Sequence, residues 1–284
     1  MTAAGRSGEV ITSAANPRVR VALALRERRG RAATGRLLVD GSREVLRALE
    51  AGLMVREAFV APGPSAPEAA DVVARLAAMG VPLVAVAGAA WSRLAYGERG
   101  SEVIAVVDAP PTDLTHLEPI VAITSDPLLI VVEDAEKPGN VGAIARSADG
   151  AGATALLVAV HRGAAADPWN PNAIRSSLGT VLSLPIAVAP TRTLLPWLRD
   201  RSIRIVAARV QATADYRDAD LRGSVAVVVG SEAAGLGPDW LAEDVAGVRL
   251  PMLGRADSLN VAAAAAVLLY EARRQRDGMG SPTP

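Results

Sequence analysis

The stretch VVEDAEKPGNVGAIARSADG, residues 131–150, contains the transition that sets the fold class of this chain. A run of β-branched residues ends in three carboxylates, Glu133, Asp134 and Glu136. A Pro-Gly-Asn turn follows, and a helical pattern with a single arginine, Arg146, begins after it. A strand, a polar loop and a helix in this order form a ligand site in open α/β sheets, so the stretch predicts an α/β fold with a site at the end of this strand.

Further apolar runs follow this stretch and resemble buried strands. They lie at residues 153–160, 184–189, 203–210 and 224–230. The runs are near-continuous rather than alternating, which is typical of parallel strands covered on both faces. Helical stretches separate them, and a last helix is expected in SLNVAAAAAVLLYEARRQ with Ser258 as its N-cap. Periodicity alone therefore predicts an ordinary doubly wound parallel sheet.

A shorter α/β/α pattern precedes this sheet. One helix is expected within residues 16–35, and Gly30 is expected to end it. Helices and strands then alternate up to residue 111. Prolines and turn formers then cluster around residues 109–125. The predicted organisation is a small domain over 1–108 with a flexible leader at 1–10, a linker over 109–125, a second domain over 126–276 and a tail over 277–284.

The composition excludes several kinds of chemistry. The 284-residue chain has no cysteine, which excludes disulfides, thiolate metal ligands and a cysteine nucleophile. Its two histidines, His116 and His161, form no metal-ligand pattern, so no metal is expected. No apolar run reaches the ~18–20 residues of a membrane span, and the N-terminus lacks the apolar core of a secretory signal. We therefore expect a cytoplasmic protein without a membrane partner.

Charge is unevenly distributed along the chain. The net charge is zero, but residues 1–47 hold ten arginines against four acids, whereas residues 48–160 hold six basic residues against fourteen acidic ones. The densest cluster includes Arg18, Arg20, Arg26, Arg28 and Arg29. A basic leading segment on a neutral chain indicates nucleic-acid binding, and a solvated helix face is the alternative interpretation.

Three segments are candidates for a cofactor site. GAGATA (150–155) follows a helix and precedes a strand, the reverse of a dinucleotide fingerprint, so it is expected to be a helix C-terminal turn. VVVGSEAAGLGPDW (227–240) places Gly230 and Glu232 after a buried strand, where glycine lets a ligand approach the backbone. A plain turn is the alternative there. RLPMLGRADSLNVAAAAAVLLYE (249–271) combines a strand, a polar loop and a long helix.

In this order and spacing, EKPGNVGAIARSADGAG, VVVGSEAAGLG and LPMLGRADSLNVAAAAAVLLYEA resemble the three motifs of the SpoU/TrmH family. These proteins are RNA 2′-O-ribose methyltransferases of the SPOUT class, and the resemblance covers about residues 126–276. The preceding unit, with NPRVR, GRLLVDGSREVLRALEAG and VREAFVAPG, is similar to the family's substrate-binding domain, which is like ribosomal protein L30e. The resemblance implies a parallel sheet with a deep C-terminal trefoil knot, although threaded loops are otherwise almost absent from proteins.

The resemblance also implies S-adenosylmethionine as the cofactor, bound in a bent shape by the loops of the knot. The positions that match the family's cofactor pocket are Gly230, Leu250, Met252, Ser258 and Leu259. The positions that match its polar catalytic site are Asn140, Arg146, Glu232 and Asn260. Ser176 or Ser177 matches a family segment next to the site, without an assigned role.

Individual roles follow from the chemistry of these side chains. We expect Arg146 to hold the RNA phosphate beside the target ribose and to stabilise developing alkoxide charge, because a guanidinium stays protonated and is a poor base. A surface arginine paired with Asp149 is the alternative. Glu232 is the expected proton acceptor, and Asn140 is expected to cap its helix.

The family also indicates partners. Members with this leading domain mostly act on large-subunit (23S) ribosomal RNA, and the chain is similar to the avilamycin- and thiostrepton-resistance enzymes. A transfer-RNA methyltransferase and a non-catalytic RNA-binding protein are the alternatives. The apolar C-terminal helix resembles one that the family buries in a two-fold interface, so a homodimer is expected. The modified nucleotide, and a role in self-resistance or housekeeping, are left open.

Overall fold

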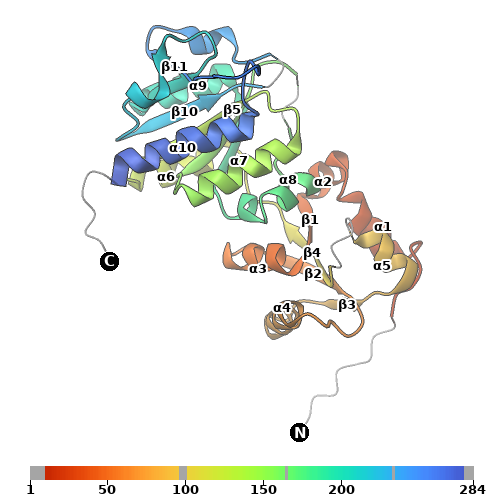
Figure 1. Ribbon diagram of the computed structural model, residues 1–284. Coiled ribbons are helices and arrows are strands. Elements are labelled where there is room, and N and C mark those ends of the chain that lie inside the picture. Colours follow the sequence, from red (N-terminus) through yellow and green to blue (C-terminus); the bar gives the residue numbers. More distant parts are fainter. Residues whose placement is uncertain (1–9, 96–100, 164–165, 232–233, 278–284) are drawn as a thin grey trace. The chain divides into compact units, whose positions relative to one another are not determined.

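The computed structural model describes residues 10–95, 101–163, 166–231 and 234–277, which form two units (Figure 1). The first unit contains the chain up to Pro110 together with Trp169–Ser183. The second unit contains Pro111–Pro168 and the chain from Leu184 onward. Each unit has its own β-sheet, and apolar side chains of the sheet and its covering helices form its core.

The sheet of the first unit has the strand order β1-β4-β2-β3. Its strands are β1 (Arg36–Asp40), β2 (Val55–Val60), β3 (Leu83–Ala85) and β4 (Val103–Asp108). Helices α1 (Pro17–Ala24) and α5 (Gly88–Leu94) pack on one face in a cluster that includes Phe59. Helices α3 (Ser42–Glu50) and α4 (Pro67–Ala78) cover the opposite face, where they contact each other and β4. The expected α/β/α domain is confirmed.

The leading helix is divided, which the sequence did not predict. Residues 16–35 form α1 and a second helix, α2 (Arg28–Thr34), instead of one helix that stops at Gly30. Gly30 lies inside α2 and approaches the end of α1 so closely that a Cβ there would lie 2.0 Å from the carbonyl oxygen of Ala24. Gly35 ends α2 in the left-handed conformation. Gly30 therefore permits close packing rather than ending the helix.

The segment Trp169–Ser183 belongs to the first unit although it lies far along the chain. Its helix α8 (Pro171–Ser176) packs against β1, and its short 3₁₀ helix η1 (Thr180–Leu182) contacts α3. The expected boundary at residue 108 therefore misses part of this unit. Local sequence patterns give no signal for such a contact, because it joins residues more than a hundred positions apart.

The second unit contains the expected parallel sheet. Its strand order is β7-β6-β5-β10-β8-β11-β9, and all the neighbouring pairs are parallel. The strands are β5 (Leu128–Glu133), β6 (Ala155–Val160), β7 (Ile186–Pro190), β8 (Arg204–Ala208), β9 (Ala214–Asp215), β10 (Val225–Val229) and β11 (Val245–Arg249). Every residue of β5 and β10 is buried, as the continuous apolar runs predict.

Helices cover both faces of this sheet. On one face, α6 (Leu114–Ile123), α9 (Thr191–Asp200) and the 3₁₀ helix η3 (Pro238–Leu241) contribute to a core cluster with alternate residues of the strands. On the other face, α10 (Val261–Asp277) packs along α7 (Pro138–Gly150) and against β10 (Figure 1). Among the described helices, none is long and apolar enough to cross a membrane.

The expected linker at 109–125 is wrong. Most of this segment forms α6, whose Leu117 and Val121 are buried in the core of the second unit. Asp113 caps the helix by accepting a hydrogen bond from the backbone N–H of His116. The cluster of prolines and turn formers concealed this helix, because Pro119 lies inside it.

A buried carboxyl group fixes the loops at the carboxyl end of β5. Glu133 is fully buried at the end of that strand. Its Oε1 accepts hydrogen bonds from the hydroxyl of Thr191 at 2.6 Å and from the indole N–H of Trp240 at 2.7 Å. Its Oε2 accepts the backbone N–H of Gly237 at 2.5 Å. One side chain thus ties β5 to the start of α9 and to the segment that follows β10.

We predict that Glu133→Ala lowers the free energy of unfolding by about 3 kcal/mol, because it leaves buried donors without an acceptor. Urea unfolding of the full chain measures the change. Glu118→Ala is the matched control, because Glu118 pairs with Arg201 at a half-exposed position, and its loss should be within about 0.5 kcal/mol. Equal losses in the two variants would contradict the anchoring role of Glu133.

Candidate functional site

A cavity of about 440 Å³ lies in the second unit, where loops leave the carboxyl ends of β8, β10 and β11. Residues 209–211 follow β8, residues 230, 231 and 234–236 follow β10, and residues 250, 252 and 257–259 lie between β11 and α10. The volume lies within the range of about 300–1,000 Å³ that is usual for small-molecule sites. The three loops thus form the walls of a candidate cofactor pocket.

The predicted cofactor residues lie together on these walls. Gly230, Leu250, Met252, Ser258 and Leu259 all line the cavity. They come from the second and third motifs, which are separated along the chain by η3 and β11. The sequence did not single out three further lining residues, Arg209, Gln211 and Asp257. The first two lie after β8, in a segment outside the three motifs.

Tight folding of the loop after β10 explains its glycines. A Cβ on Gly230 would lie 2.4 Å from the carbonyl carbon of Gly235, a distance that no side chain can tolerate. The backbone N–H of Gly235 donates to the carbonyl oxygen of Ser231 at 2.9 Å, and Gly235 itself adopts a positive φ of 64°. Glycine at both positions lets the loop fold back on itself beside the cavity.

The helix that follows the cavity is capped by a different residue from the one predicted. Ser258 is exposed and lies ahead of α10, which begins at Val261. The Oδ1 of Asn260 accepts the backbone N–H of Ala262 at 3.0 Å. Asn260 therefore caps α10, and Ser258 remains a lining residue of the cavity.

The residues of the first motif lie on α7, which follows β5. Asn140 is inside the first turn of this helix, whose N-cap position is Lys137, so the expected capping role of Asn140 is wrong. Arg146 is exposed one and a half turns later. Within the described residues it forms no ion pair with Asp149, the alternative partner. Glu232, the expected proton acceptor, lies outside the described residues.

The side chain of Ser177 stabilises a local turn. It is fully buried, and its hydroxyl donates to the carbonyl oxygen of Ile174 at 2.8 Å. The hydroxyl oxygen of Ser177 also accepts the backbone N–H of Gly179 at 3.2 Å. These bonds stabilise the turn in which Leu178 and Gly179 both have positive φ. Ser176 donates to the carbonyl oxygen of Ala173.

A local ion pair forms at β9, the edge strand of the sheet next to β11. The guanidinium of Arg217 bonds Asp215 through two contacts of 2.9 Å. These bonds, with the backbone N–H of Arg217, lower the pKa of Asp215 to about 2. The carboxylate therefore stays charged at physiological pH and neutralises Arg217.

The predicted RNA-binding arginines of the first unit have two kinds of environment. Arg18, Arg20, Arg28 and Arg29 are exposed, and Arg18 contacts Glu57 at 2.8 Å. Arg26 is half-buried, and its guanidinium donates to the carbonyl oxygens of Leu94 and Ala95. Arg26 therefore supports the packing of α5, which the sequence could not show.

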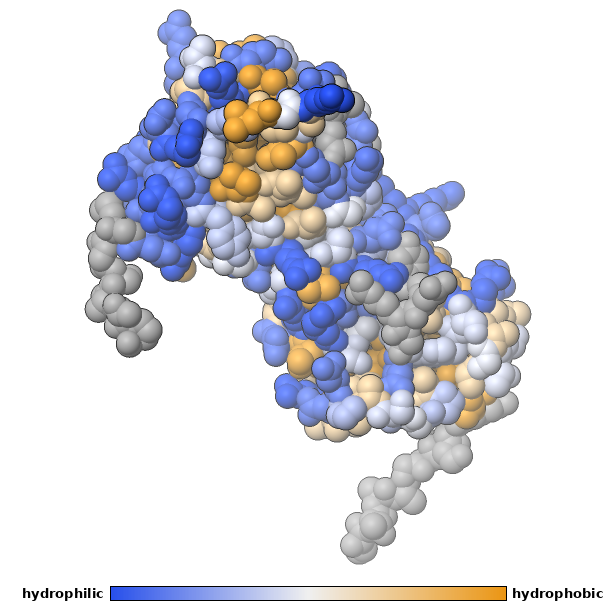
Figure 2. Space-filling model, viewed as in Figure 1, coloured by the Kyte–Doolittle hydropathy of each residue, from blue (hydrophilic) through white to orange (hydrophobic). Residues whose placement is uncertain are grey.

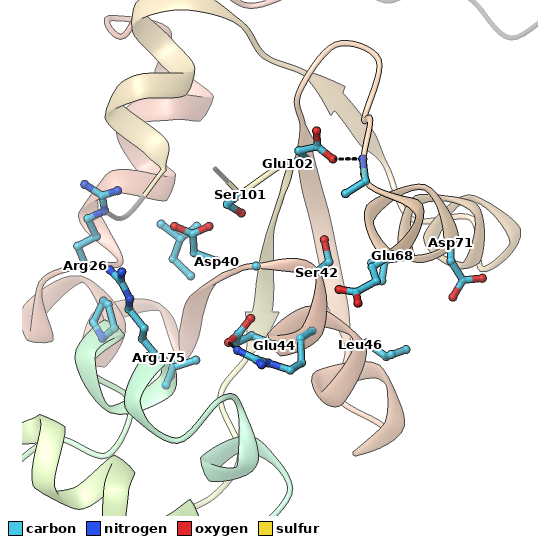
Figure 3. A pocket seen from close by; sticks show the side chains of 17 residues that line it. Arg26, Asp40, Ser42, Glu44, Leu46, Glu68, Asp71, Ser101, Glu102 and Arg175 are labelled. Carbon is cyan, nitrogen blue, oxygen red and sulfur yellow. Dashed lines mark hydrogen bonds and ion pairs between the residues drawn. The ribbon is translucent and has the colours of Figure 1, made fainter. Parts of the chain in front are cut away.

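A second cavity of about 550 Å³ lies in the first unit (Figure 3). Three of the carboxylates that line it form contacts within the unit. Glu102 accepts hydrogen bonds from the Ser65 hydroxyl and from the backbone N–H groups of Ser65 and Ala66 ahead of α4, and these bonds lower its pKa. Glu44 pairs with Arg43, and Asp71 pairs with Arg75. We assign no ligand to this cavity.

Both units match families of known proteins. Residues 127–270 match the SpoU rRNA Methylase family, and residues 16–105 match the MRM3-like substrate binding domain. A 23S rRNA (uridine(2479)-2′-O)-methyltransferase of Streptomyces viridochromogenes is 37% identical over 66% of this chain. The match spans 65% of the length of that enzyme, slightly less than two thirds.

Two crystal structures have similar folds. An RNA 2′-O ribose methyltransferase is 40% identical, with a TM-score of 0.81 over 94% of this chain and 99% of its own. The SpoU methyltransferase AviRb from Streptomyces viridochromogenes, crystallised with AdoMet, is 33% identical, with a TM-score of 0.81 over 92% of this chain and 98% of its own. With the parallel sheet and the matched motifs, these likenesses show that the chain belongs to the SpoU rRNA methylase family.

Proposed function

We propose that the chain is an S-adenosylmethionine-dependent 2′-O-ribose methyltransferase that acts on 23S-type ribosomal RNA. One observation carries the proposal: five residues from two separate motifs line one cavity at the ends of parallel strands. The names of the relatives support the substrate, and AviRb, with its bound AdoMet, supports the cofactor. Ribosomal RNA as substrate also favours a location in the cytoplasm.

The cavity fits such a cofactor in its chemistry. Leu236, Leu250 and Leu259 offer apolar surface for an adenine ring, and Ser231 and Ser258 offer hydroxyl groups. Gly230 lets the loop after β10 fold back closely on itself along the wall of the cavity. Within the described residues, no group of side chains could hold a metal ion, and the reaction needs none.

The reaction requires few groups from the protein. S-adenosylmethionine would supply an electrophilic methyl group. As the 2′-oxygen forms its bond to this methyl group in line, the methyl–sulfur bond breaks, S-adenosylhomocysteine leaves, and the hydroxyl gives up its proton. We assign the proton to Glu232, whose carboxylate is a better acceptor than a guanidinium. Asn140, in the first turn of α7, and Asn260, the cap of α10, are the polar residues that we assign to the substrate side of the site.

In this proposal Arg146 binds the RNA substrate. It is exposed on α7, the helix that follows β5, and β5 is the direct neighbour of the strand that ends at Val229. An exposed guanidinium can hold the phosphate beside the target ribose with paired hydrogen bonds. It would also stabilise the alkoxide that develops on the 2′-oxygen.

We predict that Arg146→Ala lowers the rate of methyl transfer on the order of 10²-fold or more, as for other charge-stabilising donors. Its affinity for S-adenosylmethionine should remain, because the arginine contacts RNA. Transfer is measured with labelled cofactor and 23S rRNA, and calorimetry measures affinity. Arg192→Ala, an exposed arginine on α9, is the control. Unchanged transfer by Arg146→Ala would refute its role.

The product should be mapped by mass spectrometry. Methyl groups in transfer RNA and not in 23S rRNA would contradict the substrate and leave the reaction class intact. A chain that neither binds the cofactor nor transfers methyl groups would instead be a non-catalytic RNA-binding protein. The likeness to AviRb favours a role in protecting ribosomes against an antibiotic, which depends on the nucleotide that is modified.

The connection to α10 supports a knotted chain. The segment after β11 lines the same cavity as the loop after β10, and α10 then packs against β10, β5 and α7. The chain thus leaves β11 and returns to the two neighbouring strands β10 and β5. We include the trefoil knot of the family in the proposal for this reason.

The proposal includes a homodimer. Hydrophobic side chains remain exposed around the cavity and along α10, and Figure 2 shows apolar surface gathered on that side of the second unit. They are Val210, Leu241, Leu253, Val267 and Tyr270, of which Leu253 is 99% exposed. A patch of this kind on a protein surface marks an interaction site. A second copy of the same patch would cover it with two-fold symmetry.

Light scattering at micromolar concentration should therefore give twice the mass of the chain. Leu253→Glu with Val267→Glu should shift the protein to the monomer, because each dimer would bury four new carboxylates without partners. Ile123→Glu is the matched control, since Ile123 is 85% exposed on α6, on the other face of the sheet. A wild-type monomer under these conditions would disprove the dimer.

The first unit is assigned to RNA capture. Its exposed arginines would contact phosphates, so we predict that Arg20→Ala with Arg29→Ala weakens RNA binding. The slope of log affinity against log salt should fall by roughly 0.7–0.9 for each lost contact. Filter binding over a range of salt concentrations measures it. Arg75→Ala, an arginine already paired with Asp71, is the control. An unchanged salt slope in the double variant would contradict this assignment.

A further inference from the structure

Arg209 is the basic side chain on the wall of the cofactor cavity. It directly follows β8, and its backbone N–H donates to the carbonyl oxygen of Val248 in β11 at 2.8 Å. Its carbonyl oxygen accepts the N–H of Ala212, which closes a turn. The backbone of Arg209 is therefore fixed between two strands of the sheet.

The guanidinium of Arg209 has no protein partner within the described part of the chain. Its Nε is buried without a hydrogen bond, and the side chain forms no ion pair there. Arg199 and Arg217 of the same unit each contact a carboxylate through two bonds. A buried donor without an acceptor is unfavourable, and each such group in a folded protein requires an explanation.

Gly247 accommodates the Arg209 side chain. A Cβ on Gly247 would lie 1.9 Å from Nη2 and 2.5 Å from Cζ of Arg209. The guanidinium thus lies directly against the backbone of β11, in a space that any other residue at position 247 would occupy. A glycine in the middle of a strand commonly marks such a close approach.

Charge narrows the choice of partner for this guanidinium. Arg209 and Asp257 are the charged residues among the described lining residues, and Asp257 is exposed. The proposed cofactor has two cationic groups, the sulfonium and the α-ammonium, and a single anionic group, the α-carboxylate. A guanidinium matches a carboxylate with paired hydrogen bonds, and it repels the cationic groups.

We infer that Arg209 binds the carboxylate of the amino-acid end of S-adenosylmethionine. This inference rests on the proposed function. It orients the cofactor, with the amino-acid end at β8 and the adenosine against the loops after β10 and β11. Arg209 is then a cofactor-binding residue that lies outside the three motifs.

Two cofactor analogues test this assignment by calorimetry on the full chain. S-adenosyl-L-homocysteine keeps the α-carboxylate, whereas 5′-methylthioadenosine keeps the adenosine and the sulfur but lacks the amino-acid end. Arg209→Ala should weaken binding of S-adenosyl-L-homocysteine roughly 10- to 100-fold, the loss typical of a charged hydrogen-bonded contact. Its affinity for 5′-methylthioadenosine should equal that of the wild type, which also shows that the cavity is intact.

Two further variants sharpen the test. Arg209→Lys keeps the charge and loses the paired geometry, so its loss for S-adenosyl-L-homocysteine should be intermediate. Arg217→Ala is the matched control, because that arginine is neutralised by Asp215 and does not line the cavity. Both analogues should bind Arg217→Ala as they bind the wild type.

Other outcomes overturn the inference in distinguishable ways. Equal losses for both analogues would show that Arg209 shapes the cavity instead of binding the carboxylate. Unchanged affinity for both, with weaker binding of RNA, would make Arg209 a phosphate contact. A wild-type protein that binds neither analogue would overturn the proposed function itself, and the inference with it.

Discussion

The cavity depends on the buried carboxyl group of Glu133. Hydrogen bonds to this side chain hold Thr191, Gly237 and Trp240, which come from the start of α9 and from the segment after β10. A Cβ at Gly237 would crowd this anchor, because it would lie 3.0 Å from the His161 ring and 3.2 Å from Glu133. The loop that carries Gly230 is therefore fixed at its far end by a single group inside the core. This anchoring is non-local, and the apolar pattern of β5 gives no sign of it.

The position of the cavity differs from that in an ordinary doubly wound sheet. In such sheets a ligand lies where the strand order reverses, which here is the boundary between β5 and β10. The cavity instead lies at the ends of β10, β8 and β11, one step further along the sheet. The reversal point is then adjacent to α7, which carries Arg146. Cofactor and substrate can thus occupy neighbouring parts of the same sheet edge.

Sequence patterns predicted most of the strands of the second unit, but the strand expected within residues 249–271 ends at Arg249 as β11, and the long-range contacts were predicted poorly. Each continuous apolar run became a buried strand, because burial on both faces leaves a direct mark on composition. The family motifs led to the lining residues from Gly230 to Leu259. Three interpretations failed where a local signal had two explanations. Ser258 and Asn260 are both good caps, Gly30 can end a helix or allow close packing, and a segment rich in prolines can still form α6.

Residues 169–183 prevent a simple division of the two units by truncation of the chain. The chain passes between the units after Pro110, after Pro168 and after Ser183, so the first unit is not a simple N-terminal extension. Cutting the chain at residue 108 would leave Ala173, Ile174 and Val181, which are buried in the first unit, without their packing partners. Apolar surface exposed in this way destabilises a domain and favours association. The roles proposed for the two units are therefore better separated by surface substitutions than by truncation.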